Sequence, residues 1–269
     1  MAVVLMFRGL GWNPMNLKSE GRAETLSSDI RNFDILALIG TQRQAFTDDV
    51  ITFKHVHHVE YSAGWAKGCH LSYWSCGCSI MVNNQYPPSA VRTIRIPPPH
   101  LRGRGLSLRI RDSGCHVSVF SIYFPPRPPA QKQLVPYRKT VKELIAWLGY
   151  EPDLLPARTI QLICTDLNDG VGLQQLPGVG WTAIEGDAVG DYANEQGHEA
   201  TAHMIDFRET QHMCMYNTMR TPSDHGYAFG RRREGAILVS LNVVDRIRRA
   251  GLSRGEELMD LTNAFQCTS

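Results

Sequence analysis

The sequence lacks the features of a membrane-spanning or secreted protein. No apolar run approaches the roughly 18 residues that a transmembrane helix needs. The apolar start, residues 2–7, is too short for the hydrophobic region of a signal peptide, and no basic residue precedes it. We therefore expect a protein with no membrane partner that resides inside the cell, in the cytoplasm or the nucleus.

An excess of one charge sign is also missing. The 269 residues carry 28 Lys and Arg against 26 Asp and Glu, a net charge of +2, so the whole molecule has no strong attraction for a polyanion. The basic residues are nevertheless clustered, at 102–111, 231–233 and 246–254. Such clusters fit either solvated faces or contacts to nucleic-acid phosphates.

Paired metal-binding cysteines are absent as well. The seven cysteines include no C-x2-C pair with a second such pair behind it, and the spacing of Cys76 and Cys78 does not favour zinc. An odd number of cysteines in a chain without a signal peptide favours reduced thiols.

Apolar runs and helix-like periodicities alternate along the chain, whose hydrophobic content is 43%. They predict strands at 2–10, 34–39, 50–61, 78–83, 105–111, 115–123, 160–164, 212–217 and 236–244, and helices at 17–31, 131–149, 200–209 and 246–261. We expect the first strand to end in a turn at Gly9 and Gly11. His55 and His57 share one face of the strand at 50–61, a pattern that favours a surface stripe over a metal site. The order of elements indicates an α/β fold with helices outside two packed sheets.

The most informative stretch is 158–172. Its apolar run at 160–164 predicts a buried strand, which is followed by Asp166, Asn168 and Asp169. Acid and amide groups at the end of a core strand are well placed for chemistry because the sheet fixes their backbone. The same residue types also make ordinary turns where strands stop, and this stretch alone does not separate the two readings.

Several short motifs recur in one order: residues 33–38 with Thr41, Tyr123-x-Pro125, residues 165–168 (Thr-Asp-Leu-Asn), and Asn194-x-x-Gly197 leading to Asn217-Thr218. In this order and rough spacing they resemble the endonuclease/exonuclease/phosphatase (DNase I-like) superfamily, especially the apurinic-type endonuclease domains of LINE-type retrotransposons. The resemblance covers roughly residues 1–220, which we assign to one domain. We expect residues 221–269 to be a divergent, partly helical C-terminal segment.

The resemblance implies a four-layered α/β sandwich, in which two packed, mostly antiparallel sheets are flanked by helices. It also implies a cleft at the strand ends that binds Mg²⁺ or Mn²⁺ and hydrolyses a phosphodiester. On this resemblance Asp166 positions the attacking water and is a possible metal ligand, Asn168 holds the phosphate, and Tyr123 donates its hydroxyl to the scissile phosphate. The candidate phosphate and nucleic-acid contacts are Arg102, Arg104 and Asn194, with DNA favoured over RNA.

The chain departs from the superfamily at its metal ligands. The Gln-Glu-Thr that the family carries after the second strand is here Ile39-Gly40-Thr41, so Gly40 replaces the chief metal-binding glutamate. The first strand offers no asparagine near residues 6–9, and Asn13 comes after the expected turn. With the C-terminal strands missing or altered, three residues are the remaining candidates for the closing aspartate and histidine: Asp224, His225 and Asp245.

These departures favour a degenerate member of the superfamily. It would be ancestrally a Mg-dependent phosphodiesterase that cut nucleic acid, impaired through the loss of the glutamate and the terminal histidine. One alternative is an active Mg-dependent endonuclease with relocated ligands. Another is a non-catalytic nucleic-acid-binding module that uses the arginine clusters. The sequence leaves the oligomeric state open.

Overall fold

The computed structural model describes most of the chain between residues 9 and 241. The described residues are 9–12, 17, 20–29, 31–44, 50–65, 76–112, 115–153, 159–169, 172–176, 180–183, 195–196, 199–211, 214–215 and 237–241. The helix predicted at 246–261 lies outside them.

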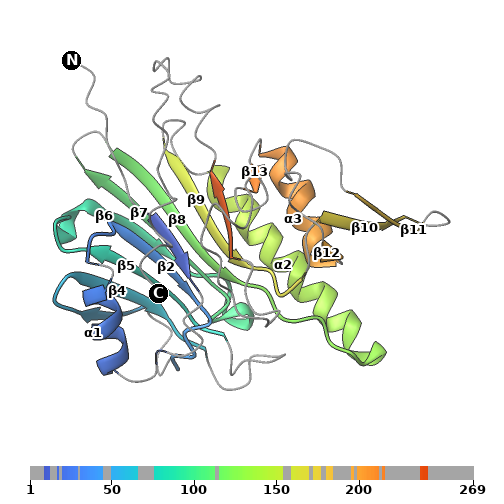
Figure 1. Cartoon of the computed structure of the whole chain (residues 1–269), viewed down its shortest axis with the longest axis horizontal. Helices are drawn as coiled ribbons and strands as arrows, with labels where there is room; N and C mark the ends of the chain where they lie inside the picture. Colours follow the sequence, from blue (N-terminus) through green and yellow to red (C-terminus); the bar gives the residue numbers. More distant parts are fainter. Residues whose placement is uncertain are drawn as a thin grey trace, which may run out of the picture.

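Two sheets make up the body of the molecule (Figure 1). The five-stranded sheet has the order β1 (Gly9–Trp12), β2 (Ile35–Ile39), β5 (Cys78–Asn83), β4 (His58–Ala63) and β3 (Ile51–Lys54). The six-stranded sheet has the order β13 (Cys214–Met215), β14 (Ile237–Leu241), β9 (Ile160–Asp166), β8 (Cys115–Tyr123), β7 (Gly105–Asp112) and β6 (Val91–Arg95). One pair in each sheet is parallel, β1–β2 and β8–β9, and the other pairs are antiparallel, as predicted.

Helices cover the outer face of each sheet. The helix α1 (Glu20–Asp29) places Leu26 against Leu36 and Met81 of the five-stranded sheet. On the other side, α2 (Leu134–Asp153) and α3 (Glu199–Thr210) cover apolar residues of the six-stranded sheet. The order helix, sheet, sheet, helix is the predicted four-layered α/β sandwich. None of the described helices is both long and apolar enough to cross a membrane.

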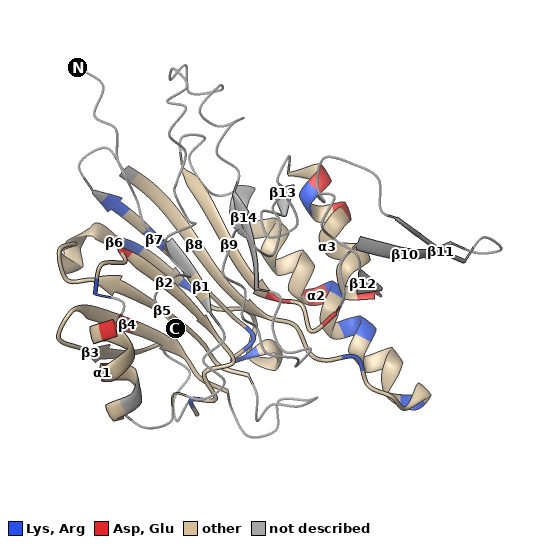
Figure 2. Cartoon of the chain, viewed as in Figure 1, with Lys and Arg blue, Asp and Glu red and all other residues tan. Residues whose placement is uncertain are grey.

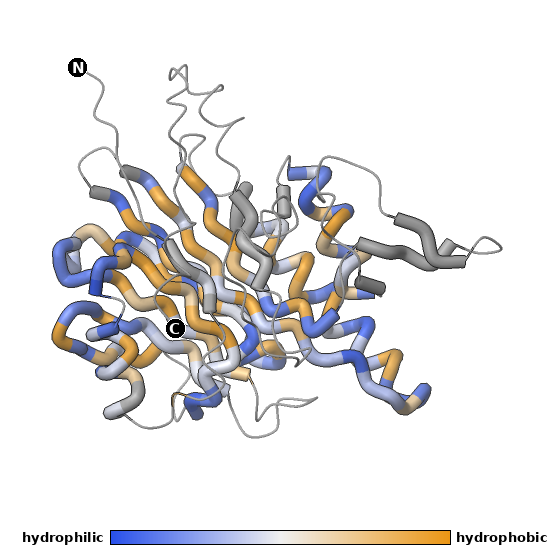
Figure 3. Tube along the Cα trace, in the orientation of Figure 1, coloured by the Kyte–Doolittle hydropathy of each residue, from blue (hydrophilic) through white to orange (hydrophobic). Residues whose placement is uncertain are grey.

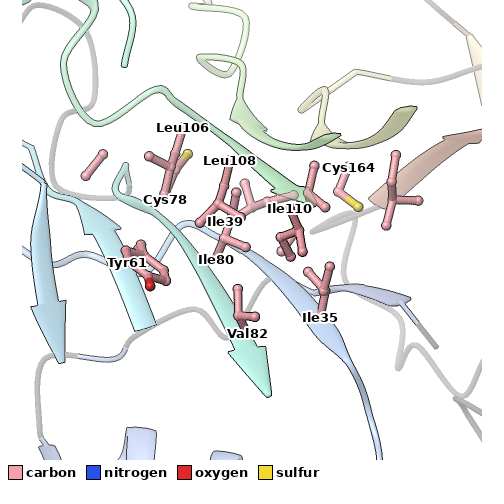
Figure 4. Close-up of a cluster of buried hydrophobic side chains, with 14 of the residues drawn as sticks. Ile35, Ile39, Tyr61, Cys78, Ile80, Val82, Leu106, Leu108, Ile110 and Cys164 are labelled. Atoms are coloured by element: carbon pink, nitrogen blue, oxygen red, sulfur yellow. The ribbon is translucent and has the colours of Figure 1, made fainter. Parts of the chain in front are cut away.

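The largest core lies between the two sheets. Side chains such as Ile35, Ile80, Leu108 and Cys164 point into it from both sides (Figure 4). The strands are accordingly apolar along most of their length (Figure 3). Cys78 and Cys164 are buried free thiols in this core, and burial raises the pKa of Cys164 to about 12.

A third, smaller sheet lies apart from the two main ones. It contains β10 (Gly172–Leu176), β11 (Gly180–Ala183) and β12 (Glu195–Gln196), with β10 in the middle. In Figure 1 the β10–β11 hairpin projects beyond α3, away from the body of the sandwich.

The structure differs from the predicted elements in the N-terminal sheet. The strand expected at 50–61 is a hairpin, in which β3 and β4 are separated by a turn closed by the His55 N to His58 O hydrogen bond of 2.8 Å. The described part of the first strand runs to Trp12, because this segment pairs with β2 as far as Leu38, so Gly9 and Gly11 lie in the strand rather than in a turn. Asn13 therefore follows the strand directly in sequence and lies outside the described residues.

The strand expected at 236–244 is present as β14. It pairs with β9 over five positions, although it lies inside the segment 221–269 that we expected to diverge from the main domain. Residues 237–241 are therefore part of the main six-stranded sheet.

Candidate functional site

Three neighbouring strands bring Arg104, Tyr123 and Asp166 to one end of the six-stranded sheet. Tyr123 is paired with Asp166 in the parallel register of β8 and β9. The backbone N of Tyr123 donates to the carbonyl oxygen of Arg104 at 2.9 Å, just before β7 begins. These three residues, which we call the Arg104–Tyr123–Asp166 row, were each predicted as site residues, and the structure places them side by side.

The side chains of the row face the space between the two sheets. Val119 on β8 and Cys164 on β9 both belong to the inter-sheet core, and residues two apart on a strand share a face. Tyr123 and Asp166 therefore point to that same face. The guanidinium carbon of Arg104 lies 5.7 Å from the centre of the Tyr123 ring, which places this cation on the same side.

All three side chains of the row are buried. The exposed fractions are 1% for Arg104, 4% for Tyr123 and 2% for Asp166. Arg102, the other predicted phosphate contact in this stretch, is half-buried, and its backbone N donates to Pro99 O. The row is a charged and polar end to an otherwise apolar interior, and charges interact more strongly there than they do in water.

Local hydrogen bonds fix the backbone around Asp166. The N–H of Asn168 donates to Oδ1 of Asp166 at 3.1 Å, which makes the turn that ends β9. The N–H of Phe124 donates to the carbonyl oxygen of Asp166 at 2.9 Å. The carboxylate is thus held by its own loop, and the backbone of Asp166 is held by the residue that follows β8.

Asn168 has a structural hydrogen bond of its own. It adopts a left-handed conformation with φ of 49°, which asparagine tolerates better than most residues. Its Nδ2 donates to the carbonyl oxygen of Phe124 at 2.8 Å, so the amide ties the loop after β9 to the end of β8. A contact from Asn168 to a bound phosphate would have to form alongside this bond or replace it.

Gly40 lies across the sandwich from this row. The hydroxyl of Ser121 donates to the carbonyl oxygen of Leu38 at 2.8 Å, so Leu38 of β2 lies opposite Ser121 of β8 across the sandwich. Both strands end on this side of the molecule, so Gly40 and Tyr123, each two residues further on, lie at about the same level. Gly40 has a φ of 70° and no side chain, and the wall opposite Asp166 therefore carries no carboxylate at this position.

Backbone hydrogen bonds join the two sheets at the same end. The N–H of Thr41 donates to Gly77 O at 3.0 Å, and the N–H of Gly77 donates to Gly103 O at 2.7 Å. Gly77 has a φ of 111°, and a Cβ on it would lie 2.5 Å from Oγ1 of Thr41. The segment after β2, the start of β5 and the approach to β7 are thereby joined next to Arg104.

Among the described residues at this end, Asp166 is the carboxylate that could contribute to holding the divalent ion that the resemblance implies. Mg²⁺ prefers several oxygen ligands in octahedral geometry. Among the described residues, no three His, Cys, Asp or Glu side chains come together as a metal site. The nearby Asp169 accepts a hydrogen bond through Oδ2 from the N–H of Thr201 at 3.2 Å, in the first turn of α3.

A second charged cluster, which the sequence did not indicate, lies beneath α1 on the outer face of the five-stranded sheet. Arg43 donates from Nε and Nη2 to the two carboxylate oxygens of Glu60, each at 2.9 Å. His55 bridges Glu60 and Glu24, with its ring nitrogens 3.0 and 3.1 Å from their oxygens. We call these four residues the Glu60 cluster.

The charges of the Glu60 cluster shift two pKa values in opposite directions. The hydrogen bond to Glu60 raises the pKa of His55, and it outweighs the opposing effect of burial. Burial alone would raise the pKa of Glu60, but the hydrogen bond from His55 and the charge of Arg43 outweigh it and lower that pKa. Since both ring nitrogens of His55 face carboxylates, the geometry suits the doubly protonated imidazolium. The side chain of His55 is only 6% exposed, so the expected surface stripe is wrong for this residue.

The remaining predicted site residues fall outside the described part of the chain. They are Asn194, Asp224, His225 and Asp245. The described strand β14 bears on Asp245, because it is antiparallel to β9 and pairs Ile237 with Asp166 but Leu241 with Leu162. This strand therefore leads away from the row before the chain reaches Asp245.

Comparison with known proteins places this arrangement in a known fold. No protein-family model matches the sequence, and no curated protein matches it. An AP endonuclease from Archaeoglobus fulgidus is 13% identical over 88% of this chain and 86% of its own, with a TM-score of 0.52. The AP endonuclease LMAP from Leishmania major is 12% identical over 88% of this chain and 79% of its own, with a TM-score of 0.53.

The endonuclease domain of TRAS1, a telomere-specific non-LTR retrotransposon, is 15% identical over 89% of this chain and 86% of its own, with a TM-score of 0.46. At such low identities a structural likeness speaks to the fold alone. The likeness to the two AP endonucleases confirms the DNase I-like fold that the sequence motifs indicated.

Proposed function

We propose that this chain is a nucleic-acid-binding protein with a phosphodiesterase fold whose metal-dependent hydrolysis is impaired. The observation that carries the proposal is Gly40, which stands across from Tyr123 with a backbone conformation that favours glycine. Asp166 and Tyr123 remain at the strand ends, as the resemblance to the superfamily requires. DNA is the proposed partner.

The electrostatics of the site support this impairment. A divalent cation is held by converging anionic and neutral oxygens, and Asp166 is the only carboxylate of the row. The guanidinium of Arg104 lies over Tyr123, and this cationic group repels a second cation at this end. Loss of one preorganised electrostatic group commonly slows an enzyme by ~10²–10³. Loss of the glutamate that binds the metal would act in the same direction.

One alternative function has a specific observation in its favour. Asp166 is fixed in its turn by the hydrogen bond from Asn168 and sits beside Tyr123, which is the placement that a water-positioning carboxylate needs. In an active enzyme Asp166 would contribute to holding Mg²⁺ or Mn²⁺ together with relocated ligands. The ion would polarise the phosphoryl oxygens.

A nicking assay on supercoiled plasmid separates the two functions. We expect the wild-type protein, with Mg²⁺ or Mn²⁺, to cut no faster than Asp166→Ala or than the wild type in a chelator. Asp206→Ala removes an exposed carboxylate from α3 and serves as the matched control. Metal-dependent cutting that survives in Asp206→Ala and disappears in Asp166→Ala would establish the active enzyme and overturn the proposal.

A further inference from the structure

The outer face of the six-stranded sheet is divided into an apolar half and a polar half. Near the row, Phe120, Ile122 and Ile163 belong to the cluster of buried residues packed with α2 and α3. At the other end of the same strands the outward positions are polar. Strands usually bury an apolar face against another layer, so a polar half is suited to a polar partner. Ser118 and His116 on β8 are buried, so the accessible part of this half lies along β7 and its edge neighbour β6.

The register places two arginines in this polar half. Arg109 lies between Thr93 of β6 and Ser118 of β8, and Arg111 is paired with His116. Both arginines alternate with Leu108 and Ile110, which point into the inter-sheet core, so they face outward. Arg109 and Arg111 are about 6.8 Å apart along one face of a strand.

The sequence around these two positions is rich in arginine, although Arg102 and Arg104 lie at the other end of the strands. Residues 91–123 contain six arginines, no lysine, no glutamate and a single aspartate, Asp112. The whole chain has a net charge of only +2, so this region is far more basic than the rest. The blue at the end of β7 in Figure 2 marks part of this region. Arginine is the side chain best suited to phosphate, since its planar fork donates two parallel hydrogen bonds.

The arginines of the polar half differ from others in the chain in their pairing. Arg43 and Arg138 form ion pairs with Glu60 and Glu199. Within the described part of the chain, Arg109 and Arg111 form no ion pair, and Nε of Arg109 is buried without a hydrogen-bond partner. Arg111 is exposed and Arg109 is half-buried, so Arg111 is the more accessible of the two to an external anion.

Protection of a sheet edge does not explain Arg109 and Arg111. Charged residues on an edge strand discourage pairing with a second sheet, and β6 is the edge of this sheet. Arg92 and Arg95 on β6 fit that purpose. Arg109 and Arg111 lie on β7, which has neighbours on both sides. Their position calls for another role.

We propose that the polar half around Arg109 and Arg111 binds the phosphate backbone of a nucleic acid. This inference rests on the nucleic-acid binding put forward above and adds a surface separate from the Arg104–Tyr123–Asp166 row. Seven strand residues separate Arg111 from the level of Arg104, a distance of about 24 Å. Contacts there hold the backbone without reading its sequence.

The test measures DNA binding as a function of salt, using the full chain. The dissociation constant for a fluorescent DNA duplex is measured by anisotropy across a range of NaCl concentrations. We compare wild type, Arg109→Gln/Arg111→Gln, and the charge-matched control Lys132→Gln/Lys142→Gln. Both control lysines are exposed and, within the described residues, unpaired. Because the arginine variant cannot bind two of the phosphates, its log–log slope should be shallower by about 1.8, whereas the control should keep the wild-type slope.

A second pair of variants keeps the test decisive if the glutamine variant misfolds. Arg109→Lys/Arg111→Lys retains both charges and should retain the wild-type slope, and thermal unfolding of each variant verifies its fold. If Arg109→Gln/Arg111→Gln and the control Lys132→Gln/Lys142→Gln had equal slopes, the proposal would be overturned, since net charge alone would then govern binding. Equally strong, equally arginine-dependent binding to polyglutamate would also overturn it, in favour of an acidic protein partner.

The outcomes for the two proposals are distinguishable. DNA binding that is insensitive to Arg109 and Arg111 removes this surface and leaves the proposed function standing. Absence of DNA binding by the wild type removes both. The nicking assay with Asp166→Ala reports on the row independently of either outcome.

Discussion

Single glycines determine how the two sheets meet at the candidate site. Gly40, Gly77 and Gly103 all have positive φ values, and they lie on three segments joined by backbone hydrogen bonds. A side chain at Gly77 would meet Oγ1 of Thr41 at 2.5 Å and the backbone N of Gln42 at 3.1 Å. The close approach of these backbones requires the absence of a Cβ at this point.

We expect Gly77→Ala to lower the free energy of unfolding by about 1–3 kcal/mol, because it combines a strained φ with a clash. Gly149→Ala is the control: it lies in α2, where an added Cβ meets nothing within 4 Å. That substitution should stabilise the protein by roughly 0.5–1 kcal/mol. Urea unfolding measures both values, and a Gly77→Ala protein as stable as the wild type would show that the junction can relax.

The residues of the row illustrate what the sequence could and could not predict. Motif order singled out Tyr123 and Asp166, and it predicted that Gly40 stands where the family that the chain resembles carries its metal-binding glutamate. That Arg104 and Tyr123 share a backbone hydrogen bond depends on the register of β7 and β8, which is set by long-range pairing. A linear pattern carries no information on that register.

At the scale of elements, the Glu60 cluster fastens α1 to the five-stranded sheet. Glu24 of α1 accepts from the N–H of Val56 at 3.0 Å and faces Nδ1 of His55 at 3.1 Å. His55 in turn contacts Glu60 on β4, so the hairpin turn between β3 and β4 lies between helix and sheet. The attachment depends on charge as well as on packing.

This attachment predicts a pH-dependent stability. The folded-state pKa of His55 is raised above its usual 6.5, so its contribution is complete below about pH 6.5 and is lost as the pH rises through the raised value. The pKa of Glu60 is lowered from 4.5, so its contribution is present above that value and is lost on acidification. Stability from this cluster is therefore greatest between these limits.

Urea unfolding of wild type and His55→Gln at pH 5.5 and pH 8.5 checks this expectation. The wild type should lose more stability between the two pH values than His55→Gln does. His57→Gln is the control, since His57 shares the turn and forms no ion pair among the described residues. A His55→Gln protein with the wild-type pH dependence would assign the effect to other groups.

Elements with a buried apolar run were predicted closely from sequence. The strand β5 matches the expected range, and β8, β9 and α3 differ from it by at most two residues at either end. The β3–β4 hairpin was missed because its alternation of polar and apolar residues continues through the turn. The Glu60 cluster was missed because Arg43 lies 17 residues from Glu60, and Glu24 lies 31 residues from His55, in the chain.

For the molecule as a whole, β14 completes the larger sheet. It covers β9, the strand that carries Asp166, and itself pairs with β13. Without β14, one side of β9 would be an unpaired edge with an apolar sequence, a feature that promotes aggregation.

We therefore expect a protein truncated after residue 220 to aggregate or to unfold without cooperativity, whereas one truncated after residue 241 should retain the fold. Size-exclusion chromatography and thermal unfolding followed by circular dichroism compare the two with the full chain. If the shorter protein were monomeric and as stable as the full chain, residues 1–220 would be a domain that folds alone.

The position of β14 also bears on how the protein is made. A ribosome completes β9 when it reaches Asp166, but β14, one of the two neighbours of that strand, is not translated until Ile237. Throughout that interval the strand of the candidate site lacks its partner on one side, so the nascent chain exposes an unpaired, aggregation-prone strand edge. A chaperone would protect the growing polypeptide most effectively during this interval, and slow codons before Ile237 would lengthen the interval.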